Sequence, residues 1–382
     1  MELTAERVVA GGDALAHAPD GRVVLVEGAL PGERVRIEVT ADRPDLLRAR
    51  AIAVIEPASD RVAPPCPHAR AGCGGCTWQH VAPVAQPALK LEILRDAFRR
   101  IAHIDDPPLA EPVVLPTDGY RTTVRVVVVG DRLAFRRRHA HETVTIDTCL
   151  VAHPLVDEVL RTGRFAGARE VTVRVGARTG ERCVLADPAT AVLEVPADVR
   201  QGPGAFVHEI VADHRFRISA RSFFQTRVDG ADALAGLVRD AVGHDRVIAD
   251  LYCGVGLFSA LVDAPRRVIA VERSRAGARD ARHNLRERPA RIVHADVARW
   301  RAEPADVVIA DPSRAGLGRE GAATVVRCRP ERVVLISCDA AALARDTSLL
   351  AGAGYGLRST VLVDLFPHTP HVECVSIFDL EP

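Results

Sequence analysis

The first 58 residues alternate apolar and polar positions in short segments separated by glycine-rich turns. A period of two predicts strands over Val23–Glu27, Arg34–Val39 and Ala51–Ile55, with Pro31 and Gly32 in the turn between the first two. Short, evenly spaced strands in so small a segment predict a closed barrel of the OB type over residues 1–58. Such barrels often bind single-stranded nucleic acid, and a β domain without that function fits the pattern equally well.

Residues 59–220 predict a second, mainly β domain. Leu91, Leu94, Phe98 and Ile101 have the spacing of one helix face, which predicts an amphipathic helix over Leu89–Ile101. The strands expected after it are Thr122–Val129, Leu133–Arg137, Val171–Val175, Arg182–Ala186 and Arg215–Ser219.

The pattern changes over residues 221–382 to alternating helix and apolar strand, beginning with a helix over Asp232–Val242. The buried strands expected here start at Val247 and continue with Val268–Glu272, Arg291–His294, Val307–Ala310 and Val333–Ser337. Two further strands, Ser359–Leu365 and His371–Leu380, predict a closing β-hairpin. The whole pattern predicts an α/β chain with a β-rich N-terminal part and a C-terminal doubly wound, Rossmann-like sheet.

Composition narrows the class of protein. The chain has 382 residues, 48% of them hydrophobic, with no apolar run of membrane-spanning length and no basic and apolar leader at its start, so we expect a cytoplasmic monomer that does not associate with membranes. The formal net charge is zero, so no global electrostatic argument for nucleic acid applies. Lys90 is the only lysine, and all other basic residues of the Lys and Arg type are arginine. This bias is typical of GC-rich coding sequences. The abundance of arginine is therefore weak support for phosphate binding.

Three cysteines, Cys66, Cys73 and Cys76, lie close together between prolines and glycines. In a cytoplasmic chain such a group favours metal binding over disulfides, and thiolates suit iron–sulfur or zinc. A fourth ligand is needed, for which Cys149 is the best remaining residue. His68 or His80 would complete a zinc site instead.

Cys338 follows the apolar strand Val333–Ser337 and precedes Asp339, which predicts a helix N-cap. Ligands collect at the carboxyl ends of strands in open α/β sheets, and a helix N-terminus lowers the pKa of a thiol. Cys338 is therefore a candidate nucleophile, and the alternative is a small buried cysteine of the core.

A glycine turn, Gly254 to Gly256, follows the strand that begins at Val247. Glu272 ends the next strand, at the spacing that places a carboxylate on ribose hydroxyls in a doubly wound sheet. Asp296 and Asp311 follow later strands. Nicotinamide and S-adenosylmethionine both fit, and the missing third glycine favours S-adenosylmethionine, which has no pyrophosphate to cradle.

Two further groups of polar residues leave their interpretation open. Glu373 falls inside the expected strand His371–Leu380, where a carboxylate is either exposed or functional. The central domain carries basic residues that could line an RNA surface or simply solvate a strand face: Arg121, Arg125, Arg136, Arg137, Arg138, His139 and His141.

Six motifs occur in order along the chain: Phe223–Gln225, Asp250–Gly256, Asp311–Arg314, Ile336–Cys338, Leu343–Asp346 and Asp364–Glu373. Together they resemble the S-adenosylmethionine-dependent RNA 5-methyluridine (uracil-C5) methyltransferases. The N-terminal barrel, especially Val26–Glu33, resembles their TRAM domain. The set Cys66, Cys73, Cys76 and Cys149 resembles the four ligands of the [4Fe-4S] cluster in the cluster-bearing branch.

The resemblance implies Cys338 as nucleophile and Glu373 as base. It implies cofactor contacts from Gln225, Tyr252, Glu272 and Asp311, with Asp296 near the adenine. Phe223, Phe224 or Phe366 could stack on a flipped base, and at least two of these three are expected in the core.

The expected activity is methyl transfer from S-adenosylmethionine to C5 of a uridine in RNA through a covalent bond between Cys338 and C6. The cluster and the barrel resemble the 23S rRNA enzymes more than the cluster-free tRNA enzymes, so rRNA is expected. The alternatives are the same chemistry on tRNA and a catalytically weakened RNA-binding protein. Three positions depart from the family pattern: Arg227, Ser313 and Asp339.

Overall fold

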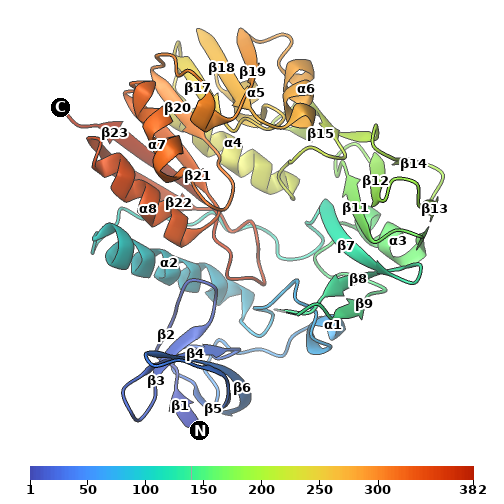
Figure 1. The fold of residues 1–382 in the computed structure, drawn as a ribbon, viewed down its shortest axis with the longest axis vertical. Helices are drawn as coiled ribbons and strands as arrows, with labels where there is room; N and C mark the ends of the chain where they lie inside the picture. The colour runs from blue at the N-terminus through green and yellow to red at the C-terminus, as the bar shows by residue number, and fades with distance from the viewer. Residues whose placement is uncertain (139) are drawn as a thin grey trace.

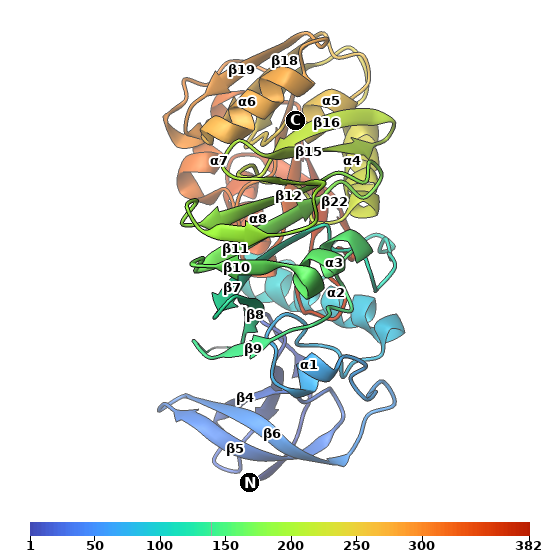
Figure 2. The ribbon, with the colours of Figure 1, turned by 90° about the vertical axis from the view of Figure 1, so that its right-hand side faces the viewer.

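The computed structural model describes residues 1–138 and 140–382 and arranges them around three main β-sheets along one long axis. The N-terminal sheet lies at one end and the C-terminal α/β part at the other (Figures 1 and 2). This arrangement confirms the predicted class, α/β with a β-rich N-terminal part.

The N-terminal sheet has six strands in the order β1-β5-β6-β4-β3-β2. Their bounds are β1 Glu2–Thr4, β2 Arg7–Val8, β3 Ala14–His17, β4 Val23–Glu27, β5 Arg34–Asp42 and β6 Leu46–Glu56. Only β4 and β6 pair in parallel. Inward-facing residues such as Val24, Val26 and Val35 form its own core. The sequence predicted β4, β5 and part of β6, and it missed the first three strands.

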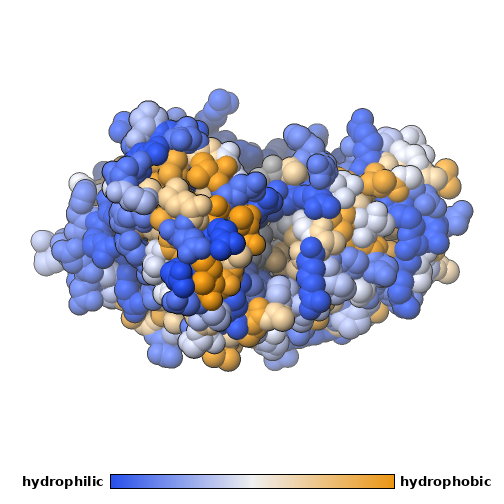
Figure 3. All heavy atoms as spheres, turned by 90° about the horizontal axis from the view of Figure 1, so that it is seen from below, coloured by the Kyte–Doolittle hydropathy of each residue, from blue (hydrophilic) through white to orange (hydrophobic). Residues whose placement is uncertain are grey.

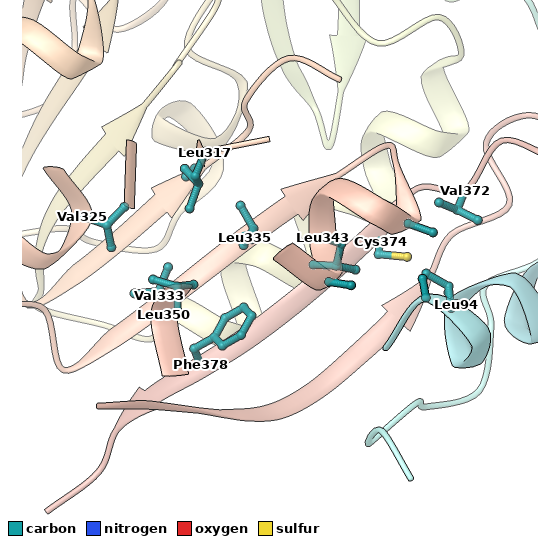
Figure 4. Close-up of a cluster of buried hydrophobic side chains, with 14 of the residues drawn as sticks. Leu94, Leu317, Val325, Val333, Leu335, Leu343, Leu350, Val372, Cys374 and Phe378 are labelled. Carbon is teal, nitrogen blue, oxygen red and sulfur yellow. The ribbon is translucent and has the colours of Figure 1, made fainter. Parts of the chain in front are cut away.

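A connecting segment holds α1 (Pro67–Arg70) and α2 (Gln86–Ala97), and α2 continues as a π-helical turn over Phe98–Ala102. α2 packs against α8 (Ala340–Ala351) of the C-terminal part. In Figure 4, Leu94 of α2 lies beside Val372 and Cys374. The predicted amphipathic helix therefore buries its apolar face against the C-terminal part.

The central sheet has the order β14-β12-β11-β7-β8-β9. Its strands are β7 Thr123–Val129, β8 Arg132–Arg136, β9 Thr143–Thr145, β11 Glu170–Val175, β12 Arg182–Asp187 and β14 Val199–Gln201. Beside it lie α3 (Pro154–Thr162) and a two-stranded pair of β10 (Arg164–Ala166) and β13 (Val192–Glu194). Val124, Val171 and Val156 of α3 share its core.

A hairpin of β15 (Phe206–Val211) and β16 (His214–Ser219) connects the central sheet to the C-terminal part. Val207 and Phe216 of this hairpin pack in one core with Leu234 of α4 (Val228–Val242). The hairpin lies before residue 220 yet contributes to the C-terminal core. The division into 1–58, 59–220 and 221–382 stays a prediction.

The C-terminal sheet has seven strands in the order β19-β18-β17-β20-β21-β23-β22. Its strands are β17 Val247–Leu251, β18 Arg267–Glu272, β19 Ala290–His294, β20 Val307–Ala310, β21 Arg332–Ser337, β22 Tyr355–Leu362 and β23 Cys374–Leu380. The first five run in parallel, and β23 is antiparallel to both of its neighbours. This is the predicted doubly wound sheet with a closing hairpin.

Two hydrophobic cores cover the two faces of this sheet. One contains residues of α2, α8 and α7 (Gly318–Arg327), and the other contains residues of α4, α5 (Leu257–Leu261) and α6 (Arg275–Asn284). Figure 4 shows the first core, where Leu343 of α8 and Val325 of α7 lie over Val333 and Leu335 of β21. Burial on both faces explains why these strands are continuous apolar runs in the sequence.

The face at the N-terminal end of the molecule is mainly hydrophilic, with hydrophobic side chains gathered in smaller patches and a hollow between its two halves (Figure 3). No helix among residues 1–138 and 140–382 is long and apolar enough to cross a membrane.

Candidate active site

Strand register brings Cys338 and Glu373 face to face. β21 and β23 pair antiparallel, and Ser337 is opposite Cys374 at the end of the ladder. Cys338 and Glu373 are the next opposed positions beyond this pair. Side chains at such positions have Cβ atoms about 4.5–5.5 Å apart. The two residues that the resemblance paired are thus neighbours at the carboxyl end of β21.

Asp311 is the third acidic group of this site. It follows β20, which pairs in parallel with β21, so its side chain emerges from the same edge of the sheet. Its carboxylate and that of Glu373 raise the pKa of the Cys338 thiol. Glu373 is only 4% exposed, and it directly precedes β23 rather than lying inside the strand as predicted.

The electrostatics differ from the expectation of an acidic thiol. Burial, together with the charges of Glu373, Asp311 and Asp339, raises the pKa of Cys338 to about 11, and Arg314 opposes this rise. Burial and the charge of Asp311 raise the pKa of Glu373 well above its usual range. The predicted lowering of the thiol pKa is therefore wrong for the free protein, because burial and three nearby carboxylates outweigh the helix N-terminus.

Asp339 has a structural role that accounts for its place beside the thiol. Its Oδ1 accepts a hydrogen bond from the backbone N–H of Ala342 at 2.9 Å, and this caps α8 as predicted. Arg227 also has a structural explanation, because it is fully buried, pairs with Asp229 at 2.7 Å and lies 4.4 Å from the ring centroid of Tyr120. Ser313 is exposed, and nothing in the structure explains its departure from the family pattern.

A pocket beside this acidic site is lined by eight of the motif residues, among them Phe223, Gln225, Tyr252, Gly254 and Asp311. Gln225 Nε2 donates to Asp311 Oδ2 at 3.4 Å. The turn from Tyr252 to Gly256 has positive φ angles of 64°, 56° and 87° at Tyr252, Gly254 and Gly256. Such angles suit glycine and bring the backbone close to whatever fills the pocket.

The predicted ribose and adenine residues lie next to this pocket. Glu272 ends β18, and its Oε2 accepts a hydrogen bond from the N–H of Gly254 at 2.9 Å, which joins it to the glycine turn. Asp296 is exposed and caps the short helix Val297–Arg299. Burial, with smaller contributions from the charges of Asp296 and Asp346, raises the pKa of Tyr252 to about 12.

Asp250 is a residue of this site that the sequence reasoning used only as part of a motif. Its side chain is fully buried, and Ser259 donates to Oδ2 through both N–H and Oγ. Oδ1 has no hydrogen-bond partner among the described residues. Burial raises the pKa of Asp250 to about 7. An unpaired buried oxygen beside the glycine turn is an unused acceptor for a bound ligand.

His371 is a second residue that the sequence reasoning missed. Its Nδ1 lies 3.0 Å from Nη2 of Arg314, which can only donate, so the ring proton is on Nε2. Burial and the charge of Arg314 together lower the pKa of His371 to about 4, so the ring is neutral at physiological pH. Its place two residues before Glu373, in a histidine- and proline-rich stretch, was the available signal in the sequence.

The four predicted cluster cysteines, Cys66, Cys73, Cys76 and Cys149, line one pocket together with His68. His80 does not line it. Burial raises the pKa of Cys73, Cys76 and Cys149, to about 12 for Cys76. No group of three His, Cys, Asp or Glu side chains in the described part of the chain is arranged to hold a metal ion.

Three of the seven residues of the predicted basic surface are paired with carboxylates. Arg125 binds Glu170, Arg137 binds Glu142, and Arg138 binds both Asp13 and Glu27. Arg121 lines the cysteine pocket, and His139 lies outside the described residues. These pairs favour the interpretation of a solvated face over an RNA surface.

Comparisons with known proteins agree with this architecture. The TRAM domain family matches residues 2–52. An uncharacterized RNA methyltransferase of Streptomyces avermitilis is 34% identical over 98% of this chain and 96% of its own length. The 23S rRNA (uracil(1939)-C(5))-methyltransferase RlmD of Bordetella parapertussis is 32% identical over 96% of this chain and 90% of its own length.

The solved structures include a close match in fold. The tRNA (uracil-54, C5)-methyltransferase of Pyrococcus abyssi, in complex with S-adenosyl-L-homocysteine, aligns with a TM-score of 0.75 at 22% identity, over 99% of this chain and 100% of that one. The shared fold and the relatives above 30% identity lead to one conclusion. The chain belongs to the RNA uracil-C5 methyltransferase family.

Proposed function

We propose that this protein transfers a methyl group from S-adenosylmethionine to C5 of a uridine in RNA. The observation that carries the proposal is the opposition of Cys338 and Glu373 at the end of the β21–β23 ladder, beside the pocket of Gln225, Tyr252 and Asp311. A nucleophile, a base and a ligand pocket then share one edge of the sheet.

The chemistry requires a nucleophile because C5 of uracil is a weak carbon nucleophile. The Cys338 thiolate adds to C6, and the electron pair of the C5–C6 double bond makes C5 reactive. S-adenosylmethionine supplies the methyl group. Glu373 then removes the proton from C5, and the electron pair left behind expels the thiolate. General-base help of this kind is typically worth about 10²–10⁴-fold.

The protonation states of the free protein must change before this reaction. The Cys338 thiol is protonated at neutral pH, because burial and neighbouring carboxylates raise its pKa to about 11, and burial and the charge of Asp311 also raise the pKa of Glu373. Positive charge brought into the pocket beside Asp311 would favour the ionised carboxylates and reduce the repulsion they exert on a thiolate. Binding of a cationic cofactor is therefore expected to activate the site.

S-adenosylmethionine fits the pocket on three observations. The glycine turn lets backbone approach a ligand, Glu272 at the end of β18 is placed for ribose hydroxyls, and Asp250 Oδ1 is an acceptor without a partner among the described residues. We expect Gln225 and Asp311 to hold the methionine end, with Asp296 near the adenine.

Incubation with labelled S-adenosylmethionine and uridine-bearing rRNA or tRNA tests the function. We expect label at C5, loss of the covalent RNA adduct in Cys338→Ala and accumulation of the adduct in Glu373→Gln. Cys183→Ala is the matched control, because Cys183 is buried in β12 and lines none of these sites. Absence of transfer to any RNA by the wild type would contradict the proposal, and an adduct in Cys338→Ala would contradict the choice of thiol.

We also propose that Cys66, Cys73, Cys76 and Cys149 hold a [4Fe-4S] cluster. The proposal is supported by the four thiols that line one pocket, because Cys thiolates are the ligands of such clusters. Methyl transfer needs no electron transfer, so the cluster would serve to fix this loop region.

Anaerobic purification is expected to give a brown protein with about four iron and four sulfide per chain. Cys76→Ala should lose both, and Cys183→Ala should keep them. Stoichiometric zinc without iron would contradict the cluster.

We propose 23S rRNA as the substrate, supported by the relatives named as 23S rRNA methyltransferases. Mapping 5-methyluridine in rRNA and tRNA from cells with and without the gene separates this substrate from tRNA. Loss of the modified base from rRNA alone is expected.

A further inference from the structure

A hollow lined by basic side chains lies in the C-terminal part, on the side that faces away from the N-terminal sheet. It is lined by Arg221, Ser274, Arg275, Arg279, Arg282 and His294, and no carboxylate takes part in its lining. α6 carries three of these arginines and lies near the end of the molecule opposite β1–β6 (Figures 1 and 2). In a chain with zero net charge, this is a local excess of positive charge.

The three arginines of α6 share one face. Arg275, Arg279 and Arg282 follow the spacing i, i+4 and i+7, so their side chains project in the same direction. Arg221 joins them from the segment between β16 and α4. The sequence folds so that two distant segments present guanidinium groups to one hollow.

These arginines are exposed and mostly without ion-pair partners. Among the described residues, Arg221, Arg275 and Arg282 have no carboxylate within salt-bridge distance, and Arg279 donates only to Ser219 Oγ at 3.2 Å. Elsewhere in the molecule, most arginines with such exposure pair with Asp or Glu, as Arg178 does with Asp232. The group around this hollow therefore repels itself and attracts anions.

The arginines are not needed to hold α6 in place. Asp280, which is fully buried on the opposite face of the helix, accepts hydrogen bonds from Ser219 N–H at 2.7 Å and from Ser222 Oγ at 2.6 Å. Asn284 Nδ2 donates to the carbonyls of Arg217 and Val255. Buried groups fix the helix, so the exposed face is free for another role.

We propose that this hollow binds backbone phosphates of the RNA substrate, outside the pocket where the target base reacts. This inference rests on the proposed function for its ligand. Guanidinium groups form paired hydrogen bonds with phosphate oxygens, and the N-terminus of α6 adds a favourable partial positive charge. Ser274, which caps α6, lines the hollow, and its backbone N–H donates to Oε1 of Glu272, the carboxylate that also accepts from the glycine turn. Contacts to phosphates carry no base information, so the surface would position RNA irrespective of its sequence.

The double variant Arg275→Gln/Arg282→Gln tests the proposal by RNA binding in filter or fluorescence assays over a range of salt. Loss of two phosphate contacts should lower the slope of log Kd against log salt by about 1.4–1.8. Binding should weaken several-fold at low salt for RNAs of different sequence. The dissociation constant for S-adenosylmethionine and the kcat at saturating RNA should not change, because neither residue touches the reacting groups.

Arg95→Gln/Arg301→Gln is the matched control. Arg95 and Arg301 are also exposed and without a carboxylate partner among the described residues, but they lie away from the hollow. An equal loss of RNA affinity in this control would show a global charge effect and overturn the proposal. An unchanged salt slope in Arg275→Gln/Arg282→Gln, with the thermal midpoint preserved, would also overturn it.

RNA binding is measured without methyl transfer, so the two proposals fail separately. A wild type that binds RNA through this hollow but methylates none would retain the surface and refute the proposed function. If the wild type methylates RNA and both double variants bind RNA with the affinity of the wild type, the proposed function stands and the proposed surface is refuted.

Discussion

Nζ of Lys90 lies 2.5 Å from Oδ1 of Asp364, and both side chains are buried. Nζ also donates to the carbonyl oxygen of Phe366 at 2.9 Å. This pair joins α2 to the segment Asp364–Glu373, which ends at the proposed base. The one lysine of the chain is thus placed where a compact, buried ammonium group binds two oxygens.

Removing the lysine should therefore destabilise the protein strongly. Lys90→Met leaves the Asp364 carboxylate buried without its counter-ion, which typically costs about 3–5 kcal/mol in the free energy of unfolding. Urea denaturation measures this loss. Lys90→Met/Asp364→Leu removes both charges and should recover most of it. A double variant as unstable as the single one would show that packing, not the uncompensated charge, dominates.

Gly12 joins the N-terminal sheet to the same segment. A Cβ at Gly12 would lie 2.5 Å from Cβ of Pro370 and 2.8 Å from Nε1 of Trp78. Gly12→Ala should displace this contact, lower the thermal midpoint and reduce methyl transfer. Gly11→Ala is the control, because Gly11 has a similar positive φ and nothing within 4 Å of its Cβ position. Equal effects of the two variants would assign the loss to backbone strain alone.

The acidic surroundings of Cys338 predict a pH dependence. The thiol pKa of about 11 lies above neutrality, so the thiolate fraction, and with it the alkylation rate of Cys338 in the free protein, should rise about tenfold per pH unit from pH 7 to 10. Asp339→Asn removes one negative charge and keeps an N-cap residue, so it should lower the pKa and speed alkylation at pH 8. Mass spectrometry of the Cys338 peptide measures the rate. Slower alkylation in Asp339→Asn would contradict this electrostatic account.

Of the three phenylalanines expected to offer a surface for a flipped base, Phe223 is the exposed one. It is 67% exposed and lines the cofactor pocket, whereas Phe224 is buried in the core and Phe366 packs against it. Phe223→Ala should raise the KM for RNA by the equivalent of about 1–3 kcal/mol and leave stability unchanged. Phe224→Ala should instead lower the thermal midpoint. An unchanged KM in Phe223→Ala would exclude the stacking role.

The C-terminal fold was largely predictable because its strands are buried on both faces. Val307–Ala310 and Val333–Ser337 are uninterrupted apolar runs, and polar residues mark where each ends. β1 and β2 have only 3 and 2 residues, too few to show an alternating pattern. β15 is buried at every second position, but its sequence does not alternate, because Glu209 is at a buried position and Phe206 and Ile210 are at half-buried ones.

The chemistry of the site was predictable only in part. Cys338 and Glu373 could be named, but their opposition depends on the register of β21 against β23, which no local pattern reveals. The raised pKa of Cys338 depends on burial and on Asp311, which comes from another strand. Lys90 and Asp364 are separated by most of the chain, so their pairing appears only in the folded protein.

Trp78 forms hydrogen bonds both to the N-terminal part and to the segment Asp364–Glu373. Its Nε1 donates to the carbonyl of Gly12 at 3.1 Å, and its N–H donates to the carbonyl of His368 at 2.8 Å. Trp78 therefore connects the N-terminal sheet to the segment that carries Glu373, and its two hydrogen bonds stabilise the distance between them. If the N-terminal sheet holds RNA, only a uridine at a set distance from the held segment would reach Cys338 and Glu373. The enzyme would then select its target uridine by the length of RNA between the two sites.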